Sequence, residues 1–271
     1  MDFQGKEIPM GKKSKDSLGD RMKQYEDISR IYLTRRMPLI IRIDGKAFHA
    51  YTRGFDRPFD HVLQDAMHST ALYLAKFIEG CKLAYTQSDE ISLLLTDYDS
   101  IETQPWFGKN IQKLVSISAS MATMAFNRAF TNMVIDNEFD HSSVCDAHER
   151  SAGFAVFDAR AFVLPKEEVC NYFIWRQQDA IRNSIQMVGQ KYFSSNELHK
   201  KNQTEIQQML MEKHGVDWSI YPASDRFGVC ITRESYDVDG VERHKWIIDK
   251  SIPCFWKDIK YIDSAVYPSA E

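Results

Sequence analysis

The sequence lacks the features that mark membrane and secreted proteins. No apolar run approaches the roughly 20 residues that a membrane-spanning helix needs, and the polar N-terminus, MDFQGKEIPMGKKSKDSLGD, has no hydrophobic signal segment. The five cysteines are odd in number and form no C-x-x-C pair. We therefore expect a cytoplasmic protein with reduced thiols, without a membrane span, a disulfide framework or a structural zinc site.

The chain also lacks a strong positive charge and any internal repeat. Its net charge is −4, which argues against indiscriminate nucleic-acid binding, because counterion release from phosphates drives that binding. A local basic groove is still compatible with this charge. At 271 residues, of which 44% are hydrophobic, the chain can bury a sizeable core. We expect residues 1–271 to form a single catalytic unit.

The apolar periodicity predicts secondary structure in the order strand, helix, strand, strand, helix, strand. After an opening helix that Asp16 could cap, the predicted elements are a strand at 37–43, a helix at 58–79, a hairpin at 82–96, a helix at 109–130 and a strand within 153–165. This order is typical of the split βαβ, or ferredoxin-like, arrangement, an antiparallel sheet with both helices on one face. Two helical segments, from 166 and from 195, and a hairpin around Asp239-Gly240 follow. We therefore expect an α+β fold.

One strand ends abruptly at Asp44-Gly45. An Asp-Gly pair alone favours a tight hairpin turn. The following residues, KAFHAYTRGFDRPFD, do not alternate as a second strand would, and helical periodicity begins at Pro58, with Asp60 suited to cap the helix. Asp44 therefore lies where a strand gives way to a loop and then to a helix.

The expected topology brings Asp44 close to Asp89 and Glu90. The first and third strands of a split βαβ unit are antiparallel neighbours, so the end of one faces the turn before the other. Carboxylates this close repel each other unless a proton or a cation lies between them. Because no His or Cys cluster lies nearby, Mg²⁺ is the first choice. Two such ions suit phosphoryl or nucleotidyl transfer, and the loop GKAFH could cradle phosphates through its N–H groups.

Five motifs occur in the order and spacing of a known family. They are RIDGKAFH at 42–49, RPFD at 57–60, AYTQSDEISLLL at 84–95, FDAR at 157–160 and WRQQDAIRNS at 175–184. With the opening helix DSLGDRMKQYE, they resemble the tRNA(His) guanylyltransferases and their guanylyltransferase-like relatives, which add nucleotides in the 3′-to-5′ direction. The resemblance implies a polymerase-palm-like catalytic core at 16–165 and a helical and hairpin extension at 166–271.

The resemblance also implies a reaction and a set of site residues. A 5′-monophosphorylated tRNA is activated with ATP, and the 3′-hydroxyl of an incoming GTP or other NTP then attacks it. Asp44, the Gly45 carbonyl and Asp89 would bind two Mg²⁺ ions, with Glu90 beside them and Arg57 needed for activation. The family further suggests a homotetramer. The implied nucleotide-binding residues are Gly45, Lys46, Ala47, Phe48, His49, Thr52, Asp60 and Ser88, and the implied tRNA contacts are Arg176 and Asn183.

The sequence departs from the family pattern in one motif. Enzymes dedicated to tRNA(His) carry His-Ile-Asn-Asn where this chain has Ile181-Arg182-Asn183-Ser184. This departure favours template-dependent repair of 5′-truncated tRNAs over guanylation of tRNA(His). Two rival interpretations stay open, a nucleotide cyclase that uses the same sheet without RNA, and a non-catalytic tRNA-binding protein.

Several of these residues also have structural interpretations. Asp60 could be only a helix cap, and His49 could be a partly buried loop residue. Arg176 and Asp179 are spaced for an ion pair on one helix. Trp175 and Phe173 are expected in the core.

Overall fold

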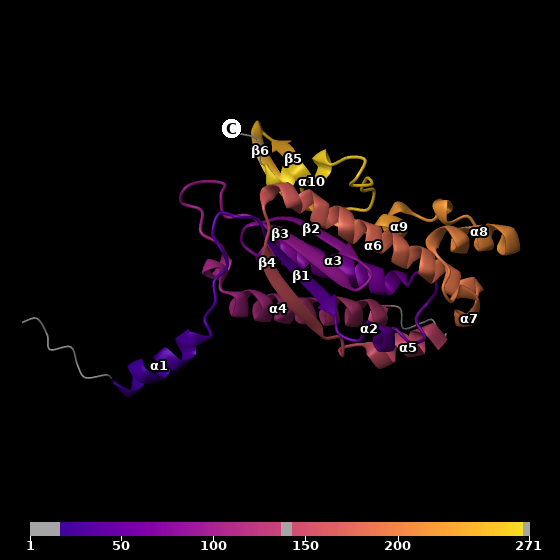
Figure 1. Ribbon diagram of the computed structural model, residues 1–271, viewed down its shortest axis with the longest axis horizontal. Coiled ribbons are helices and arrows are strands. Elements are labelled where there is room, and N and C mark those ends of the chain that lie inside the picture. Colours follow the sequence, from indigo (N-terminus) through magenta and orange to yellow (C-terminus); the bar gives the residue numbers. More distant parts are fainter. Residues whose placement is uncertain (1–16, 137–142, 268–271) are drawn as a thin grey trace, which may run out of the picture.

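A six-stranded antiparallel sheet forms the centre of the protein (Figure 1). The computed structural model describes residues 17–136 and 143–267. The strand order is β4-β1-β3-β2-β5-β6, and every neighbouring pair is antiparallel. The first four strands therefore have the predicted ferredoxin-like order. The strands are β1 (Leu39–Gly45), β2 (Cys81–Gln87), β3 (Glu90–Leu95), β4 (Phe157–Val163), β5 (Val229–Val238) and β6 (Val241–Asp249).

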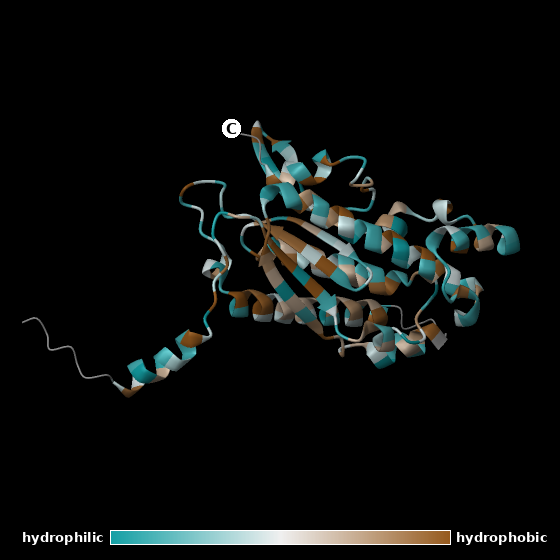
Figure 2. Ribbon diagram, viewed as in Figure 1, coloured by the Kyte–Doolittle hydropathy of each residue, from teal (hydrophilic) through white to brown (hydrophobic). Residues whose placement is uncertain are grey.

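Two long helices, α3 (His61–Phe77) and α4 (Ile111–Asp136), pack on one face of the sheet, as predicted. Alternate residues of β1, among them Ile41 and Ile43, are fully buried against this helical layer. Figure 2 shows brown, hydrophobic residues in the central strands and teal, hydrophilic ones over much of the outer helices. The main hydrophobic core therefore lies between this face and the two helices.

Helix α6 (Lys166–Tyr192) covers the opposite face of the sheet. Ile40 of β1 and Leu94 of β3 pack there against Phe173, together with residues of α10 (Lys260–Val266). Successive residues of a strand point to opposite faces, so Asp44 shares this second face with Ile40. The face is therefore apolar at one end of β1 and acidic at the other.

The described part of the chain contains more elements than the sequence pattern predicted, both before and after residue 166. Hairpin β5–β6 turns at Asp239-Gly240, as predicted, and adds to the sheet beside β2. The cap of helix α1 (Leu18–Ile28) is Ser17, whose side chain accepts a hydrogen bond from the Asp20 N–H; Asp16, the predicted cap, lies outside the described residues. The remaining elements are α2 (Phe48–Tyr51), α5 (Ser143–Ser151), α7 (Ser195–Leu198), α8 (Gln203–His214), α9 (Ala223–Phe227) and two 3-10 helices (Trp106–Lys109 and Trp218–Ile220).

Helix α1 lies outside the layered body of the protein. It buries none of its side chains and projects away from the sheet (Figure 1). Among residues 17–136 and 143–267, no helix is both long and apolar enough to cross a membrane.

Candidate active site

The structure brings the predicted acidic residues together at one end of the sheet. The register of β1 and β3 places Asp44 directly opposite Glu90. The Gly45 N–H donates a hydrogen bond of 3.0 Å to the main-chain carbonyl of Asp89. Residues 44 and 46 positions apart in the sequence thus meet because the two strands are neighbours.

Asp44 and Asp89 influence each other electrostatically. The Asp44 side chain is 38% exposed, whereas burial raises the pKa of Asp89, and the charge of Asp44 raises it further. A main-chain hydrogen bond and the Ser88 hydroxyl, which donates to Asp89 Oδ1 over 3.1 Å, act in the opposite direction. A cation placed between the two carboxylates would therefore remove a repulsion that is already present.

The donor set at this position fits Mg²⁺. Within the described part of the chain, no three His, Cys, Asp or Glu side chains gather into a group that could hold a metal ion. The available donors are two carboxylates, Asp44 and Asp89, and main-chain oxygens such as that of Gly45. Magnesium is usually bound by one or two carboxylates together with substrate phosphates, so a complete protein cage is not needed.

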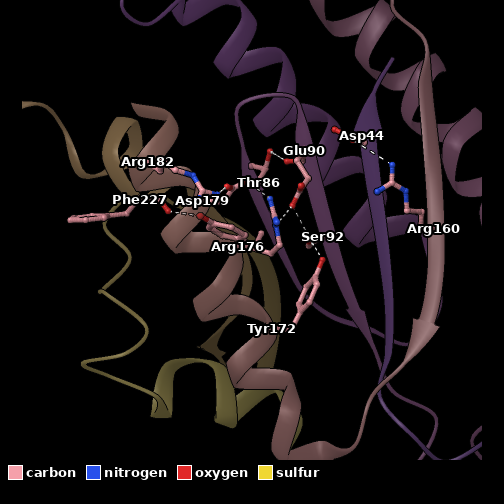
Figure 3. Close-up of polar contacts among 11 residues, drawn as sticks. Asp44, Thr86, Glu90, Ser92, Arg160, Tyr172, Arg176, Asp179, Arg182 and Phe227 are labelled. Atoms are coloured by element: carbon pink, nitrogen blue, oxygen red, sulfur yellow. Dashed lines mark hydrogen bonds and ion pairs between the residues drawn. The ribbon is translucent and has the colours of Figure 1, made fainter. Parts of the chain in front are cut away.

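Glu90 has a counter-ion of its own. Its Oε1 atom accepts a hydrogen bond of 2.8 Å from Arg176 Nε, and both side chains are buried. Arg176 also binds Asp179 Oδ2 over 2.6 Å, which is the helical ion pair expected from the spacing, and Asp179 in turn pairs with Arg182 (Figure 3). Burial raises the pKa of Glu90, and Arg176 opposes that effect. The negative charge of Glu90 is therefore compensated by Arg176 within the protein.

A buried polar network supports Glu90 and was not found from the sequence. The Ser92 and Tyr172 hydroxyls lie 2.7 Å apart, and Ser92 Oγ lies 3.4 Å from Glu90 Oε1 (Figure 3). The Thr86 hydroxyl donates to the Glu90 carbonyl over 3.0 Å. The sequence does contain one sign of this network. Ser92 interrupts an apolar strand two residues after Glu90, and its side chain therefore points to the same face of the sheet as that of Glu90.

The loop after β1 is tightly constrained. A Cβ atom on Gly45 would lie 2.2 Å from the Phe48 ring, so only glycine fits there. Ala47 has a φ of 55°, in the left-handed region. The N–H groups of Gly45 and Lys46 donate to the carbonyls of Asp89 and Val156, at 3.0 and 2.8 Å. These two groups, predicted to cradle phosphates, thus bind main-chain oxygens.

A cavity of about 520 Å³ opens beside the acids. It is bounded by the segment from α2 to the start of α3 and by the β2–β3 turn. Met187 and Gln190 of α6, which the sequence did not single out, close another side. Seven predicted residues line this cavity, namely Phe48, His49, Thr52, Arg57, Asp60, Ser88 and Asp89.

Asp60 caps helix α3 and also anchors the cavity wall. Its carboxylate accepts hydrogen bonds of 2.9 Å from the N–H groups of Leu63 and Asp56, and it lies 2.7 Å from His148 Nε2. Burial raises the pKa of Asp60, but hydrogen bonds from His148, Leu63 and Asp56 outweigh it and lower the pKa. The cap interpretation is confirmed, and His148 comes from α5, which the sequence did not predict.

The last motif places its residues in different environments. Trp175 is 50% exposed, so its predicted position in the core was wrong, whereas Phe173 is fully buried as predicted. Asn183 lines a second cavity of about 70 Å³ between α3 and α6. Ser184 is buried and accepts a hydrogen bond of 3.1 Å from Trp218 Nε1. Arg182 is exposed.

Comparisons with known proteins show which proteins the chain is similar to. A family model described as tRNAHis guanylyltransferase (Thg1) matches residues 19–165. Structures of bacterial tRNA(His) guanylyltransferase (Thg1)-like protein in complex with ATP and with GTP are 45% and 44% identical, with TM-scores of 0.82 and 0.77. Each covers 93% of this chain, which spans 99% and 100% of those chains. The tRNA(His) guanylyltransferase of Schizosaccharomyces pombe is 26% identical over 83% of both chains.

Proposed function

Because the chain belongs to the tRNAHis guanylyltransferase (Thg1) family, we propose that it is a nucleotidyltransferase that adds nucleotides in the 3′-to-5′ direction to the 5′ end of tRNA. The observation that carries the proposal is the meeting of Asp44 and Asp89 at one end of the sheet, beside a cavity of about 520 Å³. The complexes of similar bacterial proteins with ATP and GTP support nucleoside triphosphates as substrates.

The residues around the cavity suit distinct steps of this reaction. Two Mg²⁺ ions, held by Asp44, Gly45 and Asp89, would supply an activated attacking oxygen and stabilise the leaving pyrophosphate. His49 and Thr52 line the cavity and are proposed to hold the nucleotide. The cavity would accept first the ATP that activates the 5′-monophosphate and then the NTP whose 3′-hydroxyl attacks. Arg57 supplies a positive charge for the phosphates.

We also propose that the preferred reaction is template-dependent repair of 5′-truncated tRNAs. At the positions of the His-Ile-Asn-Asn motif, Ile181 packs partly buried against an apolar cluster and Ser184 is buried with its hydroxyl bound to Trp218. These two side chains thus offer little polar contact to a particular tRNA. Pairing with the opposite strand of the acceptor stem can select the nucleotide instead. The tetramer, the cytoplasmic location and the division into 16–165 and 166–271 stay predictions.

The test of this proposal compares two RNA substrates. We expect a higher catalytic efficiency on a tRNA that lacks its first nucleotide than on full-length tRNA(His), with the added base dictated by the nucleotide opposite. The measurement uses labelled NTPs and includes a truncated stem whose template base is changed from C to another base. Better use of full-length tRNA(His), or an added base that ignores the template, would contradict repair. A cyclic product formed from GTP without RNA would instead indicate a cyclase.

Arg57→Ala is expected to impair activation of the 5′-monophosphate more than nucleotide addition. Arg57 lines the cavity, and loss of one charged phosphate contact costs about 1.5–3 kcal/mol, or roughly ten- to hundredfold in rate. A 5′-triphosphorylated tRNA bypasses activation and should recover most of the rate. Arg53→Ala, a change to another arginine of the same cavity, serves as the comparison. Equal losses on both RNA substrates would assign Arg57 another role.

A further inference from the structure

Trp175 is a large aromatic side chain that stays half exposed on the face of the sheet that carries the acids. Its neighbours on α6, Tyr172 and Phe173, are 7% and 0% exposed, whereas Trp175 is 50% exposed. A single exposed apolar residue is common on protein surfaces and needs no explanation by itself. Trp175 differs from an ordinary exposed apolar residue in the charged and aromatic groups that surround its ring.

Two guanidinium groups lie against the Trp175 ring. Arg176 Cζ is 4.3 Å from the ring centroid and Arg42 Cζ is 5.7 Å from it. Arg176 is itself fixed by Glu90 and Asp179. The Tyr172 ring adds an edge contact, with the centroids 5.9 Å apart. The indole is thus held in place before any ligand binds, which lowers the entropy cost of binding.

This ring lies close to the catalytic acids. Arg42 precedes Asp44 by two residues on β1, so the two side chains point to the same face about 7 Å apart along the strand. Arg42 lies directly opposite Arg160 of β4. The Arg160 side chain is 53% exposed, and its Nη2 atom is 3.9 Å from Asp44 Oδ2 (Figure 3). Arg42 Nε is buried without a hydrogen-bond partner among the described residues. Positive charge therefore lies between the indole and Asp44.

An exposed, immobilised indole beside arginines has the chemistry to bind an unpaired nucleobase. Aromatic rings stack on bases that are free of a duplex, and arginines bind the flanking phosphates. We propose that Trp175, with Arg42 and Arg160, forms a stacking platform for an unpaired base at the end of the RNA substrate. The proposal rests on the proposed function. The unpaired base can come from the template nucleotide opposite the missing 5′ position or from a longer 3′ overhang.

The test measures RNA binding by the full chain without NTP. The RNAs are three hairpins: one blunt, one with a single unpaired nucleotide opposite the missing 5′ position, and one with a longer 3′ overhang. Trp175→Ala is expected to weaken binding of an unpaired end by about ten- to hundredfold, and Trp175→Phe should retain most of the affinity. Trp256→Ala removes a similarly exposed indole, 43% exposed, in the extension and should have no effect. ATP affinity should not change in any variant.

The three RNAs and the controls separate the outcomes. If Trp175→Ala already loses affinity for the hairpin with one unpaired nucleotide, the platform binds the template base. If it loses affinity only for the hairpin with the longer overhang, the platform binds the 3′ strand. Equal effects of Trp175→Ala and Trp256→Ala, equal losses on the blunt hairpin, or a Trp175→Phe variant as weak as Trp175→Ala would each overturn the platform. Wild-type protein that binds an unpaired end through Trp175 but adds no nucleotide would overturn the proposed function alone.

Discussion

Asp44→Ala and Asp89→Ala are each expected to lower the rate of nucleotide addition by about 10³-fold. Metal ions contribute several kcal/mol to charge stabilisation in a transition state, and a loss of about 4 kcal/mol corresponds to that factor. Each substitution removes one of the two carboxylates that meet where β1 faces the β2–β3 turn. The remaining carboxylate cannot replace the missing donor.

The same two variants should fold normally. Because the charge of Asp44 helps to raise the pKa of Asp89, removal of either acid relieves a repulsion, so the unfolding temperature without Mg²⁺ should be unchanged or slightly higher. The measurements are addition to a 5′-truncated tRNA and thermal unfolding. Asp258→Ala, a change at an exposed acid of the extension, is the matched control and should leave both unchanged. Wild-type rates in either active-site variant would refute the assignment of these acids to metal binding.

Arg176→Met should lower the free energy of unfolding by about 3–5 kcal/mol, because removal of one partner of a buried ion pair leaves the other charge uncompensated. Arg176 and Glu90 side chains are 6% and 9% exposed, and their contact is 2.8 Å. Methionine keeps much of the volume of arginine, so the loss reports the missing charge rather than a cavity.

A second substitution separates the effect of the uncompensated charge from general damage to α6. Adding Glu90→Gln to Arg176→Met removes the stranded charge and should restore part of the lost stability in urea unfolding. Arg182→Met provides a control on the same helix, since Arg182 also pairs with Asp179 but is 55% exposed; it should cost no more than about 1 kcal/mol. Similar losses from Arg176→Met and Arg182→Met would show that the buried pair with Glu90 contributes little.

The strand order and the meeting of the acids could be predicted from the sequence because they follow from long, regular elements. The apolar spacing of α3 and the position of Pro58 and Asp60 mark a helix start, and the order of elements then fixes which strands are neighbours. Helices α2 and α5 were missed for the opposite reason. Each is short, with four and nine residues, so neither shows a sustained apolar stripe. Contacts such as that of His148 with Asp60 hold α5 in place.

The contribution of α6 to the site could not be predicted, because its position over the second face of the sheet depends on tertiary packing. The spacing of Arg176 and Asp179 predicted their ion pair, but nothing local indicates that the same guanidinium reaches Glu90 on β3. Trp175 was placed in the core on hydrophobicity alone. Its ring instead has a guanidinium 4.3 Å away and half of its surface in solvent.

The alternation along β1 makes the core and the site depend on one another. Ile41 and Ile43 are buried beneath the sheet on the face of α3 and α4, and Arg42 and Asp44 lie on the other face. A slip of one residue between β1 and β3 would exchange the two faces, placing Asp44 in the hydrophobic layer. Such a chain would lose its core together with its catalytic alignment. The register that buries Ile41 and Ile43 is thus the same register that places Asp44 opposite Glu90, so a chain that has formed this hydrophobic core has also aligned the two acids.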